Sequence, residues 1–240
     1  MKQNQKLASI LAAALFVGGL YAPAVRAAED DQLFAMFKAE QLEYRASNRK
    51  DTYNWDAEGW IGEDYNKLWL KTEGERIVDG KVEKAEVQAL YSRLVSDFFD
   101  VQAGVRYDYK PWPNRAFGVL GLQGLAPYFF EVDAASFVSD QGEVSARLKA
   151  SYDLLFTQRL ILQPKFETNL ALQSVKERQV GSGINNVEVG ARLRYEIFRE
   201  FAPYIGVNYE RQLGQTASYV REDGEKPDNL SFMVGIRLWF

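Results

Sequence analysis

Hydrophobic and polar residues alternate along most of this chain with a period of two. In residues 99–108, FDVQAGVRYD, the odd positions are apolar or aromatic and the even positions are polar, charged or glycine. Residues 143–153 and 187–196 show the same alternation. Successive side chains of a β-strand point to opposite faces, so this pattern predicts strands with one apolar face. None of these segments has the three-to-four spacing of an amphipathic helix.

The alternating segments can be counted. We predict about twelve strands, at residues 37–45, 53–61, 67–75, 83–93, 98–108, 115–124, 128–137, 143–153, 159–170, 186–196, 202–211 and 229–240. Bacterial single-chain membrane barrels have an even number of strands of about this length. Pro164 lies inside one predicted strand, where it has no N–H for the ladder, and therefore predicts a bulge or a break.

The connections between these strands alternate in length. Short connections are predicted to be periplasmic turns, at residues 63–65, 95–97, 125–126, 156–157 and 198–200. The longer connections 172–185 and 212–228 are predicted to be external loops. This alternation is typical of outer-membrane barrels, in which turns on the periplasmic side are short.

A soluble β-sandwich also alternates, because one face of each sheet meets water. A membrane barrel is favoured by the strand length, by a terminal Phe240 and by aromatic residues at the ends of apolar faces, namely Tyr107, Tyr152, Tyr195 and Tyr209. In lipid every backbone polar group needs a partner, so only a closed sheet satisfies such strands. We therefore predict an all-β fold, a transmembrane antiparallel β-barrel.

The first 27 residues have the pattern of a cleaved signal peptide. Lys2 and Lys6 precede an apolar run at residues 7–20, and residues 23–27, PAVRA, provide a small-residue cleavage site. The apolar run is too short to cross a membrane as a helix. We predict a signal peptide at 1–27, a barrel domain at 28–240 and a location in the outer membrane of a Gram-negative bacterium.

Composition excludes several kinds of chemistry. The chain has 29 basic residues, three of them in the leader, and 33 acidic residues, which leaves a formal charge of −7 without the leader. An acidic chain is a poor partner for nucleic acid. It contains no cysteine and no histidine, so neither a thiolate site nor a Ser-His triad can be built. Residues 181–183, GSG, lack the strand-turn-helix context of a nucleophile elbow. We expect no enzymatic activity.

The inward phase of the predicted strands carries charges of both signs. The predicted inward residues include Glu43, Arg45, Asp56, Glu58, Lys71, Glu73, Glu75, Arg106, Asp108, Glu131, Asp133, Arg147, Lys149, Lys165, Glu167, Glu188, Arg192, Arg194, Glu210 and Arg237. Two interpretations stay open. These side chains form ion pairs that hold a narrow barrel together, or they line a polar path for an ion or small solute.

One stretch is more specific than periodicity. Residues 41–45 read QLEYR, residues 55–75 read WDAEGWIGEDYNKLWLKTEGE, and residues 86–93 and 98–108 read EVQALYSR and FFDVQAGVRYD. In these segments the chain resembles the copper resistance protein B family of outer-membrane barrels. The resemblance implies a role in copper homeostasis or tolerance, by binding copper, by passing it across the membrane, or by both. The predicted barrel has outer-membrane lipid as a partner, and the resemblance adds the copper ion and a periplasmic multicopper oxidase or copper carrier.

Few residues of this chain suit copper. Members of this family commonly carry a Met- and His-rich segment before the barrel, whereas here only residues 28–34 or so precede the first predicted strand. Copper(I) prefers sulfur and copper(II) prefers imidazole. The metal candidates are Met36, Glu43, Asp56, Glu58 and Met233, with Asp64, Glu73 and Glu75 as further carboxylates.

The two methionines and the carboxylates lead to a weak-binding hypothesis. Met233 has the inward phase of the last strand, which pairs with the first strand in a closed barrel, whereas strict alternation points Met36 outward. The two methionines therefore either share a site where these strands meet or simply fill gaps. Carboxylate oxygens are hard ligands with modest preference for copper. We therefore expect transport or permeation with at most weak copper binding. The alternative is a structural or small-solute barrel with little or no copper binding.

Overall fold

The computed structural model describes residues 32–240, so the predicted signal peptide and its cleavage site lie outside the described residues. The strands are β1 (Phe34–Ser47), β2 (Thr52–Gly62), β3 (Asn66–Ile77), β4 (Val82–Ser96), β5 (Phe99–Lys110), β6 (Arg115–Ala126), β7 (Phe130–Ser139), β8 (Val144–Ser151), β9 (Leu154–Leu155), β10 (Leu160–Ala171), β11 (Gly183–Tyr195), β12 (Phe201–Gln212) and β13 (Asp228–Trp239). The helical elements are η1 (Pro127–Phe129), η2 (Lys176–Arg178) and α2 (Gly214–Glu222).

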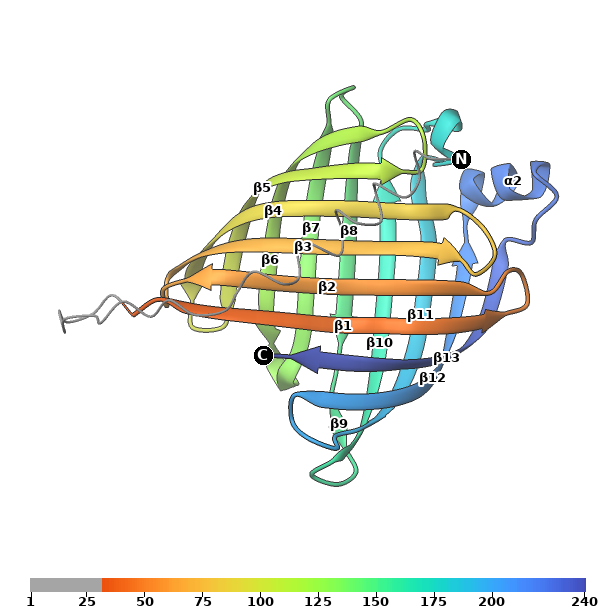
Figure 1. The fold of residues 1–240 in the computed structure, drawn as a ribbon. Coiled ribbons are helices and arrows are strands. Elements are labelled where there is room, and N and C mark those ends of the chain that lie inside the picture. Colours follow the sequence, from red (N-terminus) through yellow and green to blue (C-terminus); the bar gives the residue numbers. More distant parts are fainter. Residues whose placement is uncertain (1–31) are drawn as a thin grey trace, which may run out of the picture. The chain divides into compact units, whose positions relative to one another are not determined.

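These strands form one closed antiparallel sheet (Figure 1). Neighbours in sequence pair in order, β8 and the two-residue β9 both pair with β10, and β13 pairs with β1. Counting β8 and β9 as one interrupted strand, the ring has twelve members, which confirms the predicted number and the predicted barrel. Each of the twelve predicted ranges overlaps an observed strand. Among residues 32–240, no helix is both long and apolar enough to cross a bilayer.

The barrel is closed by hydrogen bonds at its first and last strands. The Phe37 N–H donates to the Phe240 carbonyl at 2.9 Å, and the Phe240 N–H donates back to the Phe37 carbonyl at 2.8 Å. Ring closure removes the exposed strand edges that an open sheet would present. The pairing of the last strand with the first is the arrangement expected of a closed barrel.

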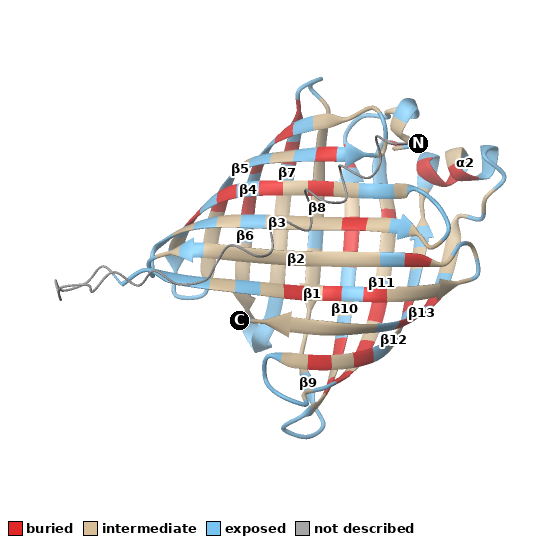
Figure 2. Cartoon of the chain, in the orientation of Figure 1, coloured by how far each residue is buried: buried red, intermediate tan, exposed pale blue. Residues whose placement is uncertain are grey.

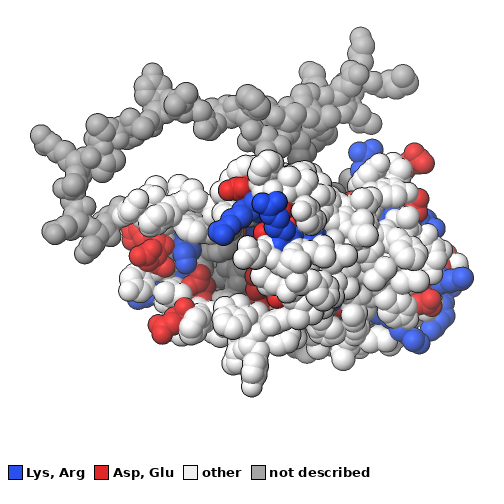
Figure 3. All heavy atoms as spheres, turned by 90° about the horizontal axis from the view of Figure 1, so that it is seen from below, with Lys and Arg blue, Asp and Glu red and all other residues white. Residues whose placement is uncertain are grey.

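The burial of side chains is inverted relative to a soluble protein. Along β13, Phe232 and Val234 are 63% and 55% exposed, whereas Ser231 and Met233, the residues that precede them, are 1% and 3% exposed. Figure 2 shows buried and exposed positions alternating along the strands in this way. In the space-filling view of Figure 3, charged side chains gather in separate groups between broad uncharged areas. An apolar outer face and a polar interior are the features of a membrane barrel.

The two ends of the barrel differ in the length of their connections. Five connections form the turn end, at residues 63–65, 97–98, 127–129, 156–159 and 196–200. Six form the loop end, at residues 48–51, 78–81, 111–114, 140–143, 172–182 and 213–227. The two longest connections are the two predicted external loops. The sequence pattern did not indicate α2, which lies in the second of them.

One turn prediction was misplaced by two residues. Leu125 and Ala126 still belong to β6, where they pair with Glu131 and Phe130, and the turn is made by η1. Two consecutive residues there, Tyr128 and Phe129, have φ of 65° and 66°. Bulky side chains rarely take left-handed φ values, so Tyr128 and Phe129 did not indicate a turn, although Pro127 at the start of η1 is a residue typical of turns.

Aromatic side chains mark the apolar surface near both ends. Of the four predicted girdle residues, Tyr107, Tyr195 and Tyr209 are exposed, and Tyr152 packs on Phe130 with ring centroids 5.0 Å apart. Exposed aromatics also lie on or beside the turn end, namely Tyr65, Phe98, Tyr128, Phe129, Phe156, Phe198 and Phe240. Rings in this position suit the interface between hydrocarbon and headgroups.

The predicted irregularity at Pro164 is a break in the neighbouring strand. The Pro164 carbonyl accepts a hydrogen bond from the Tyr152 N–H at 3.2 Å, but proline has no N–H for the reciprocal bond. The hydrogen-bond ladder between β10 and its partners β8 and β9 is interrupted between Ser151 and Leu154. The register is the same before and after the gap. β10 itself continues through Pro164 and pairs normally with β11.

A β-bulge in β1 changes which residues face the lumen. On the β2 side the register runs from Ala39 opposite Ala57 to Gln41 opposite Asp56, which leaves Glu40 as the extra residue. Before the bulge, Met36 lines the internal cavity, contrary to the outward direction predicted from strict alternation. The prediction was wrong because a bulge shifts the alternation by one residue.

Candidate functional site

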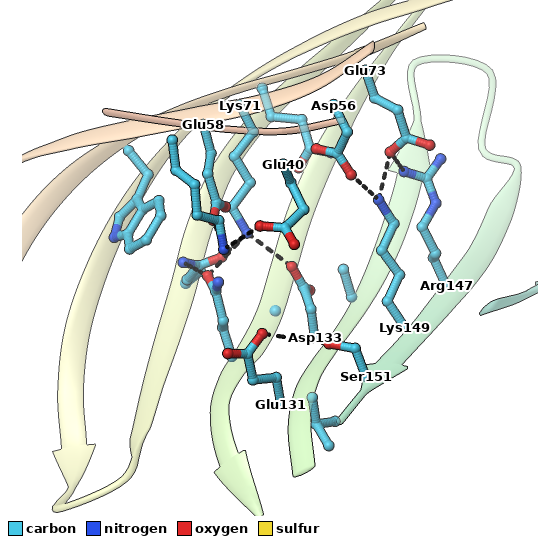
Figure 4. Close-up of a pocket in the computed structure, with 18 of the residues that line it drawn as sticks. Glu40, Asp56, Glu58, Lys71, Glu73, Glu131, Asp133, Arg147, Lys149 and Ser151 are labelled. Atoms are coloured by element: carbon cyan, nitrogen blue, oxygen red, sulfur yellow. Dashed lines mark hydrogen bonds and ion pairs between the residues drawn. The ribbon is translucent and has the colours of Figure 1, made fainter. Parts of the chain in front are cut away.

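The lumen contains a cavity of about 410 Å³ lined mainly by β1 to β8 and β10. Trp60, Trp69, Leu90 and Phe137 contribute aromatic and apolar surface, and the rest of the lining is rich in charged groups. Figure 4 shows these side chains converging on the cavity from opposite sides of the barrel. The labelled charged residues are Glu40, Asp56, Glu58, Lys71, Glu73, Glu131, Asp133, Arg147 and Lys149. A volume of this size is large enough for a small molecule.

Four carboxylates occupy neighbouring register positions on four adjacent strands. Asp108 on β5 is opposite Glu86 on β4, Glu86 is opposite Glu73 on β3, and Glu73 is opposite Asp56 on β2. We call these four residues the carboxylate row. Like charges placed directly opposite each other destabilise a sheet, so this row requires positive charge from elsewhere in the lumen.

The positive charge comes from β8, across the lumen. The Arg147 guanidinium donates to both Glu86 carboxylate oxygens, at 3.0 and 2.9 Å, and to Glu73 Oε2 at 3.2 Å. Lys149 Nζ lies 2.6 Å from Glu73 Oε2 and 3.4 Å from Asp56 Oδ2. The dashed lines from Lys149 in Figure 4 mark these two contacts. β3 and β8 are five strands apart in the ring, so these ion pairs cross the lumen.

The same network continues toward the loop end. Arg106 Nη2 lies 2.8 Å from Glu86, and the same guanidinium donates to both Asp108 oxygens at 2.6 and 3.0 Å. Arg178, from the loop between β10 and β11, reaches Asp108 at 2.6 Å. Positive and negative groups therefore alternate through eight side chains: Arg178, Asp108, Arg106, Glu86, Arg147, Glu73, Lys149 and Asp56.

Aromatic rings inside the barrel support the arginines of this network. The Arg106 guanidinium carbon lies 5.0 Å from the Phe117 ring centroid and 4.6 Å from that of Phe137. Arg147 lies 5.7 Å from Phe137. Phe117 and Phe137 form a buried cluster with Leu90 and Val119. Rings at these distances attract cations through their negative faces. We did not predict these inward rings, although Phe137 shares its phase with Glu131 and Asp133.

A second group of ion pairs lies on the other side of the lumen. Glu43 accepts hydrogen bonds from Arg192 at 3.2 Å, from Arg45 at 2.6 Å and from the Tyr204 hydroxyl at 2.7 Å. The Glu43 side chain is fully buried and that of Arg192 is 4% exposed. We call Glu43, Arg45, Arg192 and Tyr204 the packed cluster. Its carboxylate already has three donors, so Glu43 is poorly placed to bind a passing cation.

The five metal candidates do not form one site. Asp56, Glu58 and Met36 line the cavity, whereas Glu43 belongs to the packed cluster. The structure does not bring Met36 and Met233 together. Met36 is opposite Trp60, and Met233 is opposite Arg45, nine residues farther along β1, which corresponds to roughly 30 Å. Met233 is buried, with its Cε close to Gly206, which is the position of a gap-filling residue.

Most cavity carboxylates are already occupied by basic groups. Glu58 lies 3.3 Å from Lys38 Nζ, and Asp133 lies 2.9 Å from Lys71 Nζ. Glu131 is exposed and accepts a single hydrogen bond, from Ser151 at 3.4 Å. Within residues 32–240, no group of three or more Asp, Glu, His or Cys side chains is arranged to hold a metal ion. A cation entering this cavity therefore competes with lysine and arginine for the lining carboxylates other than Glu131.

Another set of ion pairs ties two connections together at the loop end. Glu225 lies 2.7 Å from Lys50 Nζ and 2.9 Å from Arg49 Nη2. The hydrogen bonds from Lys50 and Arg49 lower the pKa of the Glu225 carboxyl. Next to it, the Tyr44 hydroxyl donates to Asp51 at 2.5 Å and lowers the pKa of Asp51. These exposed contacts hold loop 48–51 against loop 213–227.

Comparison with known proteins gives both a family and a fold. Residues 33–240 match the sequence model of a family described as "Copper resistance protein B precursor (CopB)". The chain is 46% identical over 211 residues to "Copper resistance protein B homolog" of Pseudomonas syringae pv. tomato, with 88% of this chain and 71% of that protein covered. It is 42% identical over 214 residues to "Copper resistance protein B" of Escherichia coli, with 89% and 72% covered.

Solved structures share the architecture at low sequence identity. The NanC porin matches with a TM-score of 0.53 and 11% identity, covering 85% of this chain and 99% of that chain. The KdgM porin in complex with disordered oligogalacturonate matches with a TM-score of 0.52 and 10% identity, covering 85% and 98%. At this identity the similarity establishes the fold alone, which is that of an outer-membrane β-barrel.

Proposed function

This chain belongs to the copper resistance protein B family and has an outer-membrane barrel fold, and from this premise we propose that it lets copper cross the outer membrane of a Gram-negative bacterium. In this proposal copper is a substrate, bound weakly along the lumen and passed on. Its role is copper homeostasis or tolerance. We assign no catalytic step to the barrel, since the chain contains neither histidine nor cysteine.

The observation that carries the proposal is the charged cavity inside a barrel of this family. Its lining includes Asp56, Glu58 and Glu131, and Met36 adds one sulfur near the turn end. Carboxylate and thioether groups are acceptable but weak partners for copper when they act singly. Since most of these carboxylates also contact lysine or arginine, bound copper exchanges with protein cations. This arrangement favours passage over retention.

We expect different partners at the outer surface of the barrel and at its turn end. Outer-membrane lipid covers the apolar outer surface. At the turn end, copper that has crossed the lumen is exchanged with a periplasmic multicopper oxidase or copper carrier. The acidic balance of the chain, 33 acidic against 29 basic residues, disfavours nucleic acid as a partner.

A second function is favoured by one specific observation. The contacts of Arg147 and Lys149 join β8 to the acidic strands on the opposite wall, as expected if the charges mainly hold the walls together. In that case the protein is a structural or small-solute barrel with little or no copper binding.

Deleting the gene and measuring copper sensitivity and cellular copper content separates the two functions. The proposal expects the deletion strain to lose copper tolerance, and the wild-type gene to restore it. A double Asp56→Asn, Glu58→Gln variant should restore tolerance poorly, while Lys50→Gln at the loop end should restore it fully. Unchanged tolerance and copper content on deletion would favour the structural function. Tight stoichiometric copper in equilibrium dialysis of the purified barrel would contradict weak binding.

A further inference from the structure

Arg147 holds an unusual position in the lumen, because one side chain joins two adjacent acidic strands from the opposite wall. Its two terminal nitrogens contact Glu73 and Glu86, while its Nε donates to Asn169 at 3.1 Å. The guanidinium also rests on Phe137. Four neighbours on β3, β4, β7 and β10 therefore fix the position of a single positive charge.

The walls that Arg147 joins carry unequal charge. The carboxylate row places Asp56, Glu73, Glu86 and Asp108 side by side on one wall. Arg147 and Lys149 stand opposite on β8, and Arg106 lies within the acidic wall. The cavity lies directly beside these contacts, since Glu73, Glu86, Arg147 and Lys149 all contribute to its lining. Glu86 and Arg147 each stand close to the loop-end start of their strands, so an ion that moves from the cavity toward the loop end passes beside these pairs.

We propose that Arg147 determines the ion selectivity and conductance of this lumen by neutralising the carboxylate row from the opposite wall. While Arg147 bridges Glu73 and Glu86, the row presents little net charge and the passage is obstructed. Without the guanidinium, Arg106, Arg178 and Lys149 still pair with the row, but the four carboxylates and their three remaining partners carry a net negative charge that faces the lumen. Charges that line a narrow, low-dielectric passage raise the local concentration of counterions by about tenfold or more, so the passage becomes cation-selective.

Removing charge from the other side should act in the opposite direction. Lys149 and Arg147 both contact the same oxygen of Glu73, Oε2. Glu73→Gln leaves Lys149 with Asp56 at 3.4 Å as its remaining ion pair, and the balance of the lumen becomes more positive. If these residues were purely structural, Arg147→Gln and Glu73→Gln would not change the cation-to-anion selectivity in opposite directions.

The inference goes beyond the proposed function, because it concerns any small ion and does not depend on copper. The two can fail separately. Copper tolerance and copper content test the proposed function, whereas the permeability of potassium and chloride tests the role of Arg147.

The test uses the purified barrel in planar lipid bilayers with a potassium chloride gradient and no copper. The reversal potential reports the ratio of cation to anion permeability, and the current at fixed voltage reports conductance. We expect Arg147→Gln to raise the cation-to-anion ratio by about tenfold and to raise conductance. Glu73→Gln should lower the ratio below the wild-type value. Lys50→Gln removes an ion pair of the same chemistry outside the lumen and should leave both quantities unchanged.

Folding of each variant is verified by heat-modifiable migration before conductance is measured. Arg147→Lys keeps the charge but not the fork that spans both carboxylates, so it should raise conductance with little change in selectivity. If Arg147→Gln does not fold, the inference is tested by the reversal potential of Glu73→Gln and the conductance of Arg147→Lys. Reversal potentials equal to wild type in the folded Arg147→Gln and Glu73→Gln variants, or shifted in the same direction, would overturn the inference. A wild-type reversal potential in Glu73→Gln would overturn it on its own.

Discussion

Ion pairs of carboxylates with basic side chains occur on both sides of the lumen, but the paired side chains differ in their exposure to solvent. In the packed cluster, Glu43 is fully buried against Arg192, which is 4% exposed. In the cross-lumen pairs beside the cavity, Glu73 is 33% exposed and Lys149 is 20% exposed. Ion pairs without access to solvent cannot exchange partners without a large desolvation cost. Ion pairs that border a cavity can exchange partners, because an ion that enters the cavity takes the place of the partner that is lost.

A small residue makes the packed cluster possible. A Cβ on Gly235 would lie 2.7 Å from Glu43 Cβ and 2.7 Å from the Tyr204 ring. Glycine therefore lets the tyrosine hydroxyl reach the carboxylate from β12 across β13. Glu73 is contacted instead by Arg147 and Lys149, which reach it across the lumen. From this difference we expect the packed cluster to stabilise the barrel and the cross-lumen pairs to affect the passage of ions, as proposed above.

The largest expected effect is the loss of the buried carboxylate. Glu43→Gln leaves Arg192 buried without its countercharge, and removing one partner of a buried pair costs about 3 to 5 kcal/mol. The free energy of unfolding, measured by urea titration in lipid vesicles, should fall by this amount. A change as small as that of Glu73→Gln would show that the two sides of the lumen do not differ.

A smaller effect is expected for the hydroxyl that bonds to Glu43. Tyr204→Phe keeps the ring but removes a hydrogen bond to a buried charge, which contributes about 1.5 to 3 kcal/mol. The matched control is Tyr44→Phe, which removes the hydroxyl bonded to the half-buried Asp51 at the loop end. Urea titration should show a clear loss for the first variant and no measurable loss for the second. Equal losses of unfolding free energy in the two variants would contradict the idea that burial makes the hydrogen bond of Tyr204 the stronger one.

The cross-lumen pair should matter less for stability than for passage. Glu73→Gln removes a partly exposed carboxylate, and ion pairs in such surroundings contribute about 0 to 1 kcal/mol. Its unfolding midpoint should therefore stay close to that of wild type, although the reversal potential changes. A loss of stability approaching that of Glu43→Gln would mean that these charges are chiefly structural.

The smallest effect concerns the loop end and depends on pH. Lys50 and Arg49 lower the pKa of Glu225 in the folded protein, so their contact stabilises the fold above the ordinary carboxyl pKa and is lost as pH falls through the lowered value. The protection factors of residues 48–51, which compare the observed exchange rate with the intrinsic rate at the same pH, should change little between neutral pH and pH of about 5 and should fall in more acid solution. In Glu225→Gln, exchange should already be fast at neutral pH. Equal protection in the two proteins at neutral pH would exclude this contact.

The sequence by itself determined the strands, their number and the closed antiparallel barrel. Alternation is a local property, because each residue's face follows from its neighbours along the strand. It placed Asp56, Glu73, Arg147 and Lys149 in the lumen correctly. The sequence likewise carried the family resemblance, since segments such as residues 55–75 are specific over many positions.

Only the tertiary structure decided which inward residues meet. Alternation specifies a face but not a partner, and ring closure determines which strands oppose each other across the lumen. This is why the contacts of Arg147 with Glu73 and Glu86, and the entry of Arg178 from a loop, were not predictable. The bulge at Glu40 likewise reversed the direction of Met36, because one extra residue shifts every side chain before it to the other face.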